Sequence, residues 1–357
     1  MSTITIQDSK FISLRQAATL ALHNRNIRVF MQGEPGIGKT SQTGWLQDQT
    51  GYDATIINVP EMDIGDVAFP VIDHETRTTK YYPNARFLLQ HGKPVIITLD
   101  EYSKGDDPIK KMLHPTLDTF RPRLGDIPIP EGSIILLTGN LGTDGVGDSM
   151  DAHTLSRLCR VNVRKSDAEE SIIYGSDNNF HPLCIAWAHR HPQAFASYIT
   201  GDQDSNEFIF NPSKVQDSYF CPRAWENISR ILYKRENYDT ETLRAAIAGL
   251  AGESTANSFM GFIRHQDALP PWATIMADPR GTEVPTDPGA IAVLVYGALE
   301  YIKDTVSLEA FLNYMERIDL EWQSVFCIAL ARSTKKQHIG FSSKRFAAWV
   351  VENEDLL

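Results

Sequence analysis

Residues 32–40 of the chain read Gln32-Gly33-Glu34-Pro35-Gly36-Ile37-Gly38-Lys39-Thr40. Positions 33–40 fit the pattern G-x-x-x-x-G-K-T, and an apolar run over residues 27–31 comes directly before them. Glycines let backbone N–H groups turn toward phosphate oxygens, and the dipoles of a following helix add to the attraction for anions. The order therefore predicts a strand, a phosphate-binding loop and a helix. The alternative is a glycine turn that fits the pattern by chance.

The residues of this loop share one expected task, which is to hold a nucleotide: Gly33, Glu34, Pro35, Gly36, Ile37, Gly38, Lys39 and Thr40. Lys39 offers a point charge to the β and γ phosphates, and the Thr40 hydroxyl is expected to be a ligand of Mg²⁺. The cofactors that this loop predicts are therefore ATP and Mg²⁺.

Four more apolar runs of strand length follow, over residues 55–59, 95–99, 134–138 and 159–163. Five buried strands that alternate with crossover segments predict a parallel α/β sheet. After about Lys165 the strand-like runs largely stop and helical patterns take over. Because 357 residues exceed the usual size of one domain, we expect an α/β domain over residues 1–165 and helical units after it.

Two carboxylates, Asp100 and Glu101, come directly after the apolar run over residues 95–99. Ligands of an open parallel sheet bind beyond the carboxyl ends of its strands, which is where this pair is expected to lie. Asp100 is expected to hold the metal, usually through a water, and Glu101 to orient and polarise the attacking water. An apolar run followed by two acids is common, so its position after a phosphate loop is what gives this pair weight.

Two further side chains are candidates for catalysis. Asn140 follows the run over residues 134–138, so that its amide is expected to bind the γ-phosphate or the lytic water; the alternative is an asparagine tolerated in a tight turn. Arg157 lies in a short expected helix before the fifth strand, too far along the sheet to serve its own nucleotide easily. It is expected to act as an arginine finger on a neighbouring subunit, and we prefer it to Arg160. A surface arginine paired with an acid is the alternative.

The composition is that of an ordinary soluble protein. A formal net charge of −11 weighs against strong, sequence-independent binding to nucleic acid, although a local basic stripe does not conflict with it. The four cysteines form no C-x-x-C pair, which argues against a zinc knuckle or a disulfide framework. Residues 1–10 do not resemble a secretory signal, and no apolar run is long enough to span a bilayer. We therefore expect a cytoplasmic protein.

Taken together, these motifs resemble those of the MoxR-type AAA+ ATPases along most of the chain. The matching segments, quoted as they stand here, are 33–40 (Walker A), 99–101 (Walker B), 138–140 (sensor 1), 62–70 (MDIGDVAFP, the insert in the second helix), 121–132 (RPRLGDIPIPEG, the hairpin before sensor 1) and 221–226 (CPRAWE, sensor 2). Walker motifs occur in many P-loop families, whereas the hairpin before sensor 1 and the Pro-Arg-Ala of sensor 2 are much narrower signatures.

The resemblance implies a sheet of strand order 5-1-4-3-2 and a helical lid, expected over residues 166–245, in which Arg223 reaches the nucleotide. It also implies a ring, usually of six subunits, that remodels or activates a protein client, in many members beside a partner with a von Willebrand factor A domain. The chain departs from the family in carrying Cys221 where Ser or Thr is usual. Its helical region over residues 246–357 has no role that the motifs define.

The leading hypothesis is a ring-forming, Mg·ATP-dependent ATPase that remodels a protein and hydrolyses ATP at subunit interfaces. One alternative is a nucleic-acid translocase or helicase, since related AAA+ families with the same insert and hairpin move DNA. Another is a switch that assembles with ATP and turns over slowly. Both the insert and the hairpin are expected to reach toward a ring's axis, or else merely to cover the edge of the domain.

Overall fold

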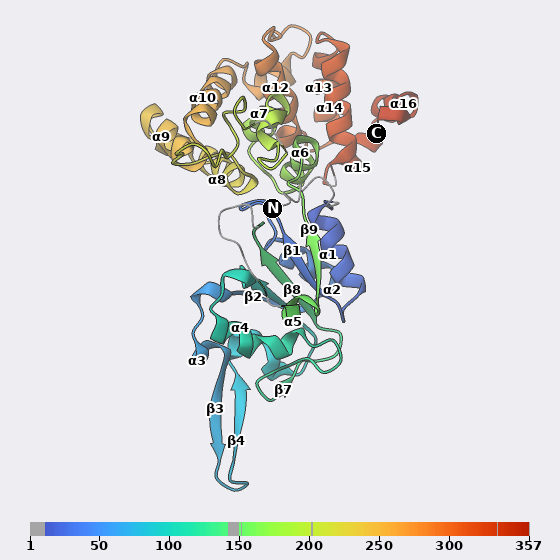
Figure 1. Ribbon diagram of the computed structural model, residues 1–357. Helices are drawn as coiled ribbons and strands as arrows, with labels where there is room; N and C mark the ends of the chain where they lie inside the picture. The colour runs from blue at the N-terminus through green and yellow to red at the C-terminus, as the bar shows by residue number, and fades with distance from the viewer. Residues whose placement is uncertain (1–10, 142–149, 151, 201–202, 334, 357) are drawn as a thin grey trace. The chain divides into compact units, whose positions relative to one another are not determined.

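The computed structural model describes residues 11–141, 150, 152–200, 203–333 and 335–356 (Figure 1). Residues 1–10, which the sequence analysis compared with a secretory signal, lie outside the described residues. The chain forms two compact units, residues 1–165 and 166–357, and each is described by itself.

The first unit is built on a five-stranded parallel sheet. Its strands are β1 (Arg28–Gln32), β2 (Asp53–Asn58), β5 (Val95–Asp100), β8 (Ile134–Gly139) and β9 (Leu158–Asn162). They are hydrogen-bonded in the order β2-β5-β8-β1-β9, all parallel. Numbered along the chain as strands one to five, this is the order 5-1-4-3-2, so the predicted parallel sheet and its strand order are confirmed.

Side-chain alternation along β1 explains why the sheet has a core on each face. Val29 and Met31 belong to one buried cluster and Phe30 to another, because successive residues of a strand point to opposite sides. The first cluster includes residues of α1 (Leu14–His23) and α2 (Gln42–Thr50), and the second includes residues of α4 (Asp107–Leu113). Strands covered on both faces read as continuous apolar runs, which is why they were predictable.

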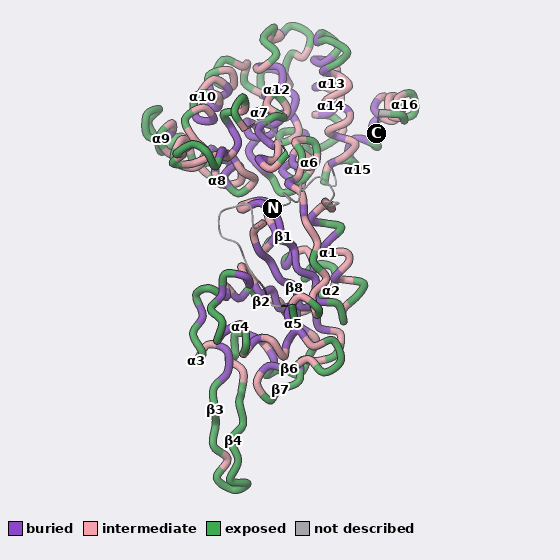
Figure 2. Tube along the Cα trace, viewed as in Figure 1, coloured by how far each residue is buried: buried purple, intermediate pink, exposed green. Residues whose placement is uncertain are grey.

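The connection between β2 and β5 was not predicted. Instead of a long crossover helix it holds the short α3 (Ile64–Val67) and an antiparallel ribbon of β3 (Ala68–Asp73) and β4 (Thr78–Pro83). The segment similar to the family's insert, residues 62–70, thus covers α3 and only the first three residues of β3. Most of the ribbon is exposed, including large side chains such as Phe69 and Ile72 (Figure 2).

A second, smaller hairpin of β6 (Arg123–Leu124) and β7 (Ile127–Pro128) docks against the base of this ribbon. The Asp126 N–H donates to the Tyr81 carbonyl at 2.8 Å, and the Tyr81 N–H donates to the Asp126 carboxylate at 2.8 Å. Gly125 lies at φ 58°, and a Cβ there would meet the Tyr81 carbonyl oxygen at 2.4 Å. The predicted hairpin is therefore joined to the ribbon whose first strand begins in the predicted insert. The remaining helix of this unit, α5 (Ala152–Leu155), leads toward β9.

The second unit is helical. Its helices are α6 (Ala168–Asp177), α7 (Pro182–Arg190), α8 (Pro222–Leu232), α9 (Thr240–Ala251), α10 (Glu253–Asp267), α11 (Trp272–Ala277), α12 (Pro288–Tyr301), α13 (Thr305–Met315), α14 (Leu320–Arg332), α15 (Gln337–Ser342) and α16 (Lys344–Glu352). Helices α7 and α12 are apolar almost all round and pack against each other, as buried central helices do. The Trp187 ring stacks on Phe259 at 4.6 Å in the same core. No helix in the described residues combines the length and apolar character needed to cross a bilayer.

His181, which caps α7, makes the second unit sensitive to acid. Its ring accepts the Leu183 N–H through Nδ1 at 3.2 Å, and burial, reinforced by Arg235, lowers its pKa to about 4. The folded pKa lies below the unfolded value of about 6.5, so the unfolded chain binds the proton more readily between these values. We expect the free energy of unfolding to fall by roughly 3 kcal/mol through this group as the pH drops from 7 to 4.

Urea unfolding followed by tryptophan fluorescence at several pH values measures this effect. His181→Asn keeps an N-cap acceptor but cannot titrate, so it is the matched variant. Its stability should change less across this pH range than that of the wild type. Equal losses in both proteins would show that His181 does not carry the effect.

Candidate active site at the carboxyl edge of the sheet

The loop after β1 has the backbone that a phosphate cradle needs. Gly36 and Gly38 lie at φ 74° and 97°, in the left-handed region that favours glycine. A Cβ on Gly33 would lie 2.7 Å from Val163 Cγ2 and 2.8 Å from the Val163 carbonyl oxygen, so that position has no room for a side chain. Glu34 and Ile37 are buried within the loop, whereas Pro35 is half-buried.

Lys39 connects this loop to the end of β8. Its Nζ donates to the carbonyls of Gly33 at 2.9 Å and Glu34 at 2.8 Å, and to Asn140 Oδ1 at 3.2 Å. The side chain is buried although it carries a charge, and these oxygen acceptors compensate that burial. The structure therefore brings the predicted phosphate lysine and the predicted amide of Asn140 together.

The carboxylate of Asp100 lies between two hydroxyl groups. Thr40 Oγ1 donates to Asp100 Oδ1 at 2.8 Å, and Thr138 Oγ1 donates to the same oxygen. The Thr138 hydroxyl also accepts the backbone N–H of Glu101 at 3.1 Å. The structure thus places the two predicted metal-binding residues, Thr40 and Asp100, in direct contact.

Glu101 has an unusual backbone for a residue with a side chain, at φ 51°. Such left-handed positions cost free energy and are concentrated at functional sites. Its carboxylate forms an ion pair with Lys104, with Nζ–Oε2 at 3.0 Å. Asn58 is the last residue of the neighbouring strand β2, and the parallel register places it beside Asp100.

These residues fit a magnesium-bound nucleotide. Mg²⁺ prefers oxygen ligands and is usually bound by one or two carboxylates plus substrate phosphates, and Asp100 with Thr40 supplies such oxygens beside a glycine-rich cradle. Within the part of the chain that the structure describes, no three His, Cys, Asp or Glu side chains gather to hold a metal ion. A divalent ion here would therefore take most of its ligands from phosphates and water.

Sequence reasoning included Thr138 in the sensor 1 segment, residues 138–140, but gave it no role of its own. Residues 134–137 are all Ile or Leu, and Thr138 is the one polar side chain in that run. It lies two residues before Asn140, and residues two apart on a strand point to the same side. The parallel pairing of β8 with β5 brings the Thr138 hydroxyl to Asp100 and to the backbone N–H of Glu101.

Arg157 lies at the other edge of the sheet. It directly precedes Leu158, which pairs with Arg28 at the start of β1, whereas the phosphate loop begins after Gln32 at the end of that strand. The length of β1, five residues at about 3.3 Å each, therefore separates Arg157 from the phosphate loop by roughly 16 Å along the strands. Its own nucleotide is therefore out of reach of the Arg157 side chain.

The surroundings of Arg157 hold it at this edge. Its Nη1 lies 2.6 Å from the ring nitrogens of His114, of which a neutral ring offers one as an acceptor, and His114 stacks on His153 at 4.6 Å. Backbone N–H groups of Arg121 and Phe120 lower the pKa of nearby Asp118, and the positive charges of Arg157 and Arg28 add to this shift. The histidine contact was not predicted, because nothing in the local sequence links residues 114 and 157.

The buried Arg28 anchors this region to the sheet. Its guanidinium donates to the carbonyl oxygens of Thr116 at 3.1 Å and Asp118 at 3.0 Å. Burial lowers its pKa to about 10, which leaves it protonated at neutral pH. The turn that carries His114 and Asp118 is thereby fixed against the start of β1.

Two other predicted residues lie apart from these contacts. Arg160 is exposed in the middle of β9, opposite Phe30 of β1. Arg223 is exposed in the first turn of α8, and Cys221 is the N-cap of that helix. Arg223 belongs to the second unit, so its role toward the nucleotide stays a prediction.

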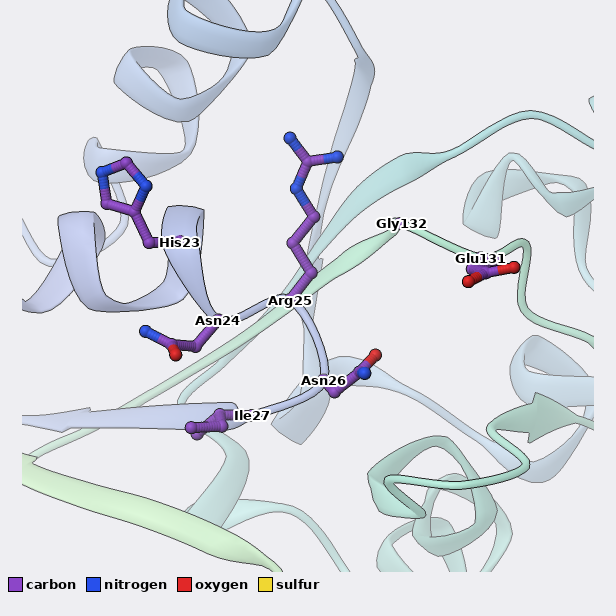
Figure 3. Close-up of a pocket in the computed structure, with 7 residues that line it drawn as sticks. All are labelled: His23, Asn24, Arg25, Asn26, Ile27, Glu131 and Gly132. Atoms are coloured by element: carbon purple, nitrogen blue, oxygen red, sulfur yellow. The ribbon is translucent and has the colours of Figure 1, made fainter.

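A surface hollow of about 430 Å³ lies at the end of the sheet opposite the phosphate loop (Figure 3). Its lining is mostly polar and comes from the residues before β1 and before β8: His23, Asn24, Arg25, Asn26, Ile27, Glu131 and Gly132. The Arg25 guanidinium donates to the Tyr52 hydroxyl at 2.6 Å. This hollow is separate from the nucleotide site because β1 runs between the two.

No protein-family model and no curated protein matches the sequence. Among solved structures, the chain is similar to the RuvB Holliday junction branch migration motor of Thermotoga maritima, at 12% identity over 85% of this chain and 86% of that chain, with a TM-score of 0.38. It is also similar to NtrX of Brucella abortus in complex with ADP, at 13% identity over 91% and 67%, with a TM-score of 0.40. The match to Hsp104 has 12% identity over 73% of this chain but only 46% of that chain, with a TM-score of 0.38. Likenesses this distant add nothing to what the strand order and contacts show.

Proposed function

We propose that the protein is a Mg²⁺-dependent ATPase of the MoxR type that works as a ring and remodels or activates a protein client. The observation that carries this proposal is the convergence of Lys39, Thr40, Asp100, Glu101 and Asn140 at the carboxyl ends of β1, β5 and β8. In a parallel α/β sheet this edge is where ligands bind.

Each residue has a task that follows from its contacts. The backbone N–H groups of the loop bind the phosphates, and Lys39 adds its charge to the β and γ groups. Thr40 and Asp100 hold Mg²⁺, which when bound neutralises charge that develops on the phosphate oxygens. Asn140, already within hydrogen-bond distance of Lys39, orients the γ-phosphate or the water that attacks it.

Glu101 is the residue that orients and polarises this water. In the observed contacts its carboxylate is paired with Lys104, and both side chains are partly exposed. Such a pair contributes little to stability and is easily broken. Hydrolysis requires Glu101 to exchange Lys104 for the water, and a pair this weak does not prevent that exchange.

Glu101→Gln is the experiment that tests this function. The amide keeps the size of the side chain but cannot polarise water, so turnover should fall about 10²- to 10⁴-fold while ATP binding is retained. Phosphate release and equilibrium binding of a fluorescent ATP analogue measure the two quantities. Lys110→Ala, on α4, removes another lysine–carboxylate pair and serves as the control for a surface change. Turnover of Glu101→Gln at the wild-type level would contradict the role of Glu101.

The place of Arg157 supports the proposal of a ring. Because its own loop is roughly 16 Å away along the strands, the arginine serves a nucleotide only when a second copy presents one to it. Closed rings form from head-to-tail contacts between identical subunits. We propose six subunits on the strength of the MoxR resemblance.

The client is proposed to be a protein segment that contacts the β3–β4 ribbon. One face of the ribbon carries Phe69, Val71 and Tyr82, which are 65%, 48% and 43% exposed, and a contiguous exposed apolar patch is typical of protein-contacting surfaces. The docked hairpin β6–β7 leads directly into β8, whose far end carries Thr138 and Asn140. The ribbon is thus mechanically connected to the strand that contacts the nucleotide-binding residues.

A further inference from the structure

We infer that Thr138 is a positioning residue that fixes both Walker B acids, Asp100 for Mg²⁺ and Glu101 for the attacking water. The inference rests on the proposed ATPase function and adds a residue to it. Thr138 is fully buried at the end of β8. Its hydroxyl joins Asp100 Oδ1 and the Glu101 N–H at once.

The chemistry of a hydroxyl suits this double contact. A threonine hydroxyl has one donor proton and two acceptor lone pairs. The proton goes to the Asp100 carboxylate, which is acceptor-only when ionised, and a lone pair receives the Glu101 N–H. Packing alone would favour another aliphatic residue here, since residues 134–137 are Ile or Leu and buried.

Asp100 gains a defined orientation from this contact. Its Oδ1 accepts hydrogen bonds from two sides, from Thr40 on the phosphate loop and from Thr138 on β8. An oxygen held by two hydroxyl groups restricts rotation of the carboxylate. The direction in which Asp100 presents its other oxygen to the metal or its water is therefore set by Thr138 as well as by Thr40.

Glu101 gains support for an unfavourable backbone. At φ 51° a residue with a Cβ is strained, and such conformations persist only where surrounding contacts hold them. The 3.1 Å hydrogen bond from its N–H to Thr138 is one of these contacts. Loss of the hydroxyl would leave this N–H without its acceptor and relax the turn that aims the Glu101 carboxylate.

The test compares Thr138→Val, which keeps the shape and removes the hydroxyl, with Thr138→Ser, which keeps the hydroxyl. Thr98→Val is the matched control, because Thr98 is equally buried on β5 but its hydroxyl bonds Thr43 at 2.7 Å instead of a carboxylate. Binding of mant-ATP is measured in EDTA and over a series of Mg²⁺ concentrations, and ATP turnover is measured beside it.

Thr138→Val should bind mant-ATP in EDTA as the wild type does, but need about tenfold more Mg²⁺ for half of the full magnesium effect. Its turnover should fall at least about tenfold, while Thr138→Ser and Thr98→Val stay within about threefold of the wild type. If Thr138→Val does not fold, the pair Thr138→Ser and Thr138→Ala, which differ by the hydroxyl alone, should show the same contrast.

An unchanged magnesium requirement and turnover in Thr138→Val, or equal behaviour of the Ser and Ala variants, would overturn the inference. These results leave the ATPase function intact, since the wild type still binds and hydrolyses ATP. Failure of the wild type itself to bind mant-ATP would instead remove the proposed function.

Discussion

Lys39→Ala is expected to reduce ATP affinity at least about a hundredfold, because each charge-assisted hydrogen bond to phosphate is worth roughly 1.5–3 kcal/mol and the lysine makes more than one. The Lys39 ammonium already donates hydrogen bonds to the Gly33 and Glu34 carbonyls of the phosphate loop and to Asn140. Phosphate oxygens offer it stronger acceptors than these carbonyls. Equilibrium binding of mant-ATP measures the loss directly.

The control separates the lost charge from a collapsed loop. Lys39 is buried, so its removal also takes a donor from the Gly33 and Glu34 carbonyls. Lys39→Arg keeps a positive charge and donors but not the compact ammonium, so it should bind more weakly than the wild type while remaining folded. Unchanged affinity in a folded Lys39→Ala protein would show that the phosphates bind elsewhere.

Arg157→Ala is expected to reduce turnover about 10³-fold or more, the usual contribution of an arginine finger, and to leave ATP affinity nearly unchanged. Arg157 stands at the edge of the sheet opposite its own phosphate loop, so it adds nothing to binding within one subunit. Steady-state phosphate release together with mant-ATP binding measures both quantities.

Arg160→Ala is the matched control, since it removes another arginine three residues along the same segment. Arg160 is exposed in the middle of β9 and should affect turnover by no more than about twofold. If Arg160→Ala abolished turnover and Arg157→Ala did not, the finger would have been assigned to the wrong residue.

Most of the first unit was predictable because its sheet is parallel and its central strands β1, β5 and β8 are buried on both faces. Each strand is then an apolar run that stands out from its surroundings, as residues 134–137 show. The strand order came from the resemblance, since no local pattern states which strands become neighbours. The β3–β4 ribbon was missed because its one apolar run, residues 68–72, contains Pro70, which argues against a strand, and because β4 is largely polar.

The candidate site also contains residues that the sequence predicted and contacts that it did not. Lys39, Asp100 and Asn140 were found because each follows a recognisable strand or motif. The contacts of Thr138 with Asp100 and of His114 with Arg157 were not predicted, because these partners are distant in sequence and are brought near by packing and register. A pattern along the chain contains residue types and spacings, but not contacts between neighbouring strands or across a turn.

The central claim is that one subunit binds the nucleotide and its neighbour supplies the arginine. Mixing Lys39→Ala with Arg157→Ala subunits tests it most directly, because each parent lacks a different half of the site. In randomly mixed rings at equal amounts, about one interface in four pairs an intact Lys39 with a neighbouring Arg157. We predict that the mixture recovers about a quarter of the wild-type turnover although both parents are inactive. Mixed assemblies that form but stay as inactive as their parents would contradict the account.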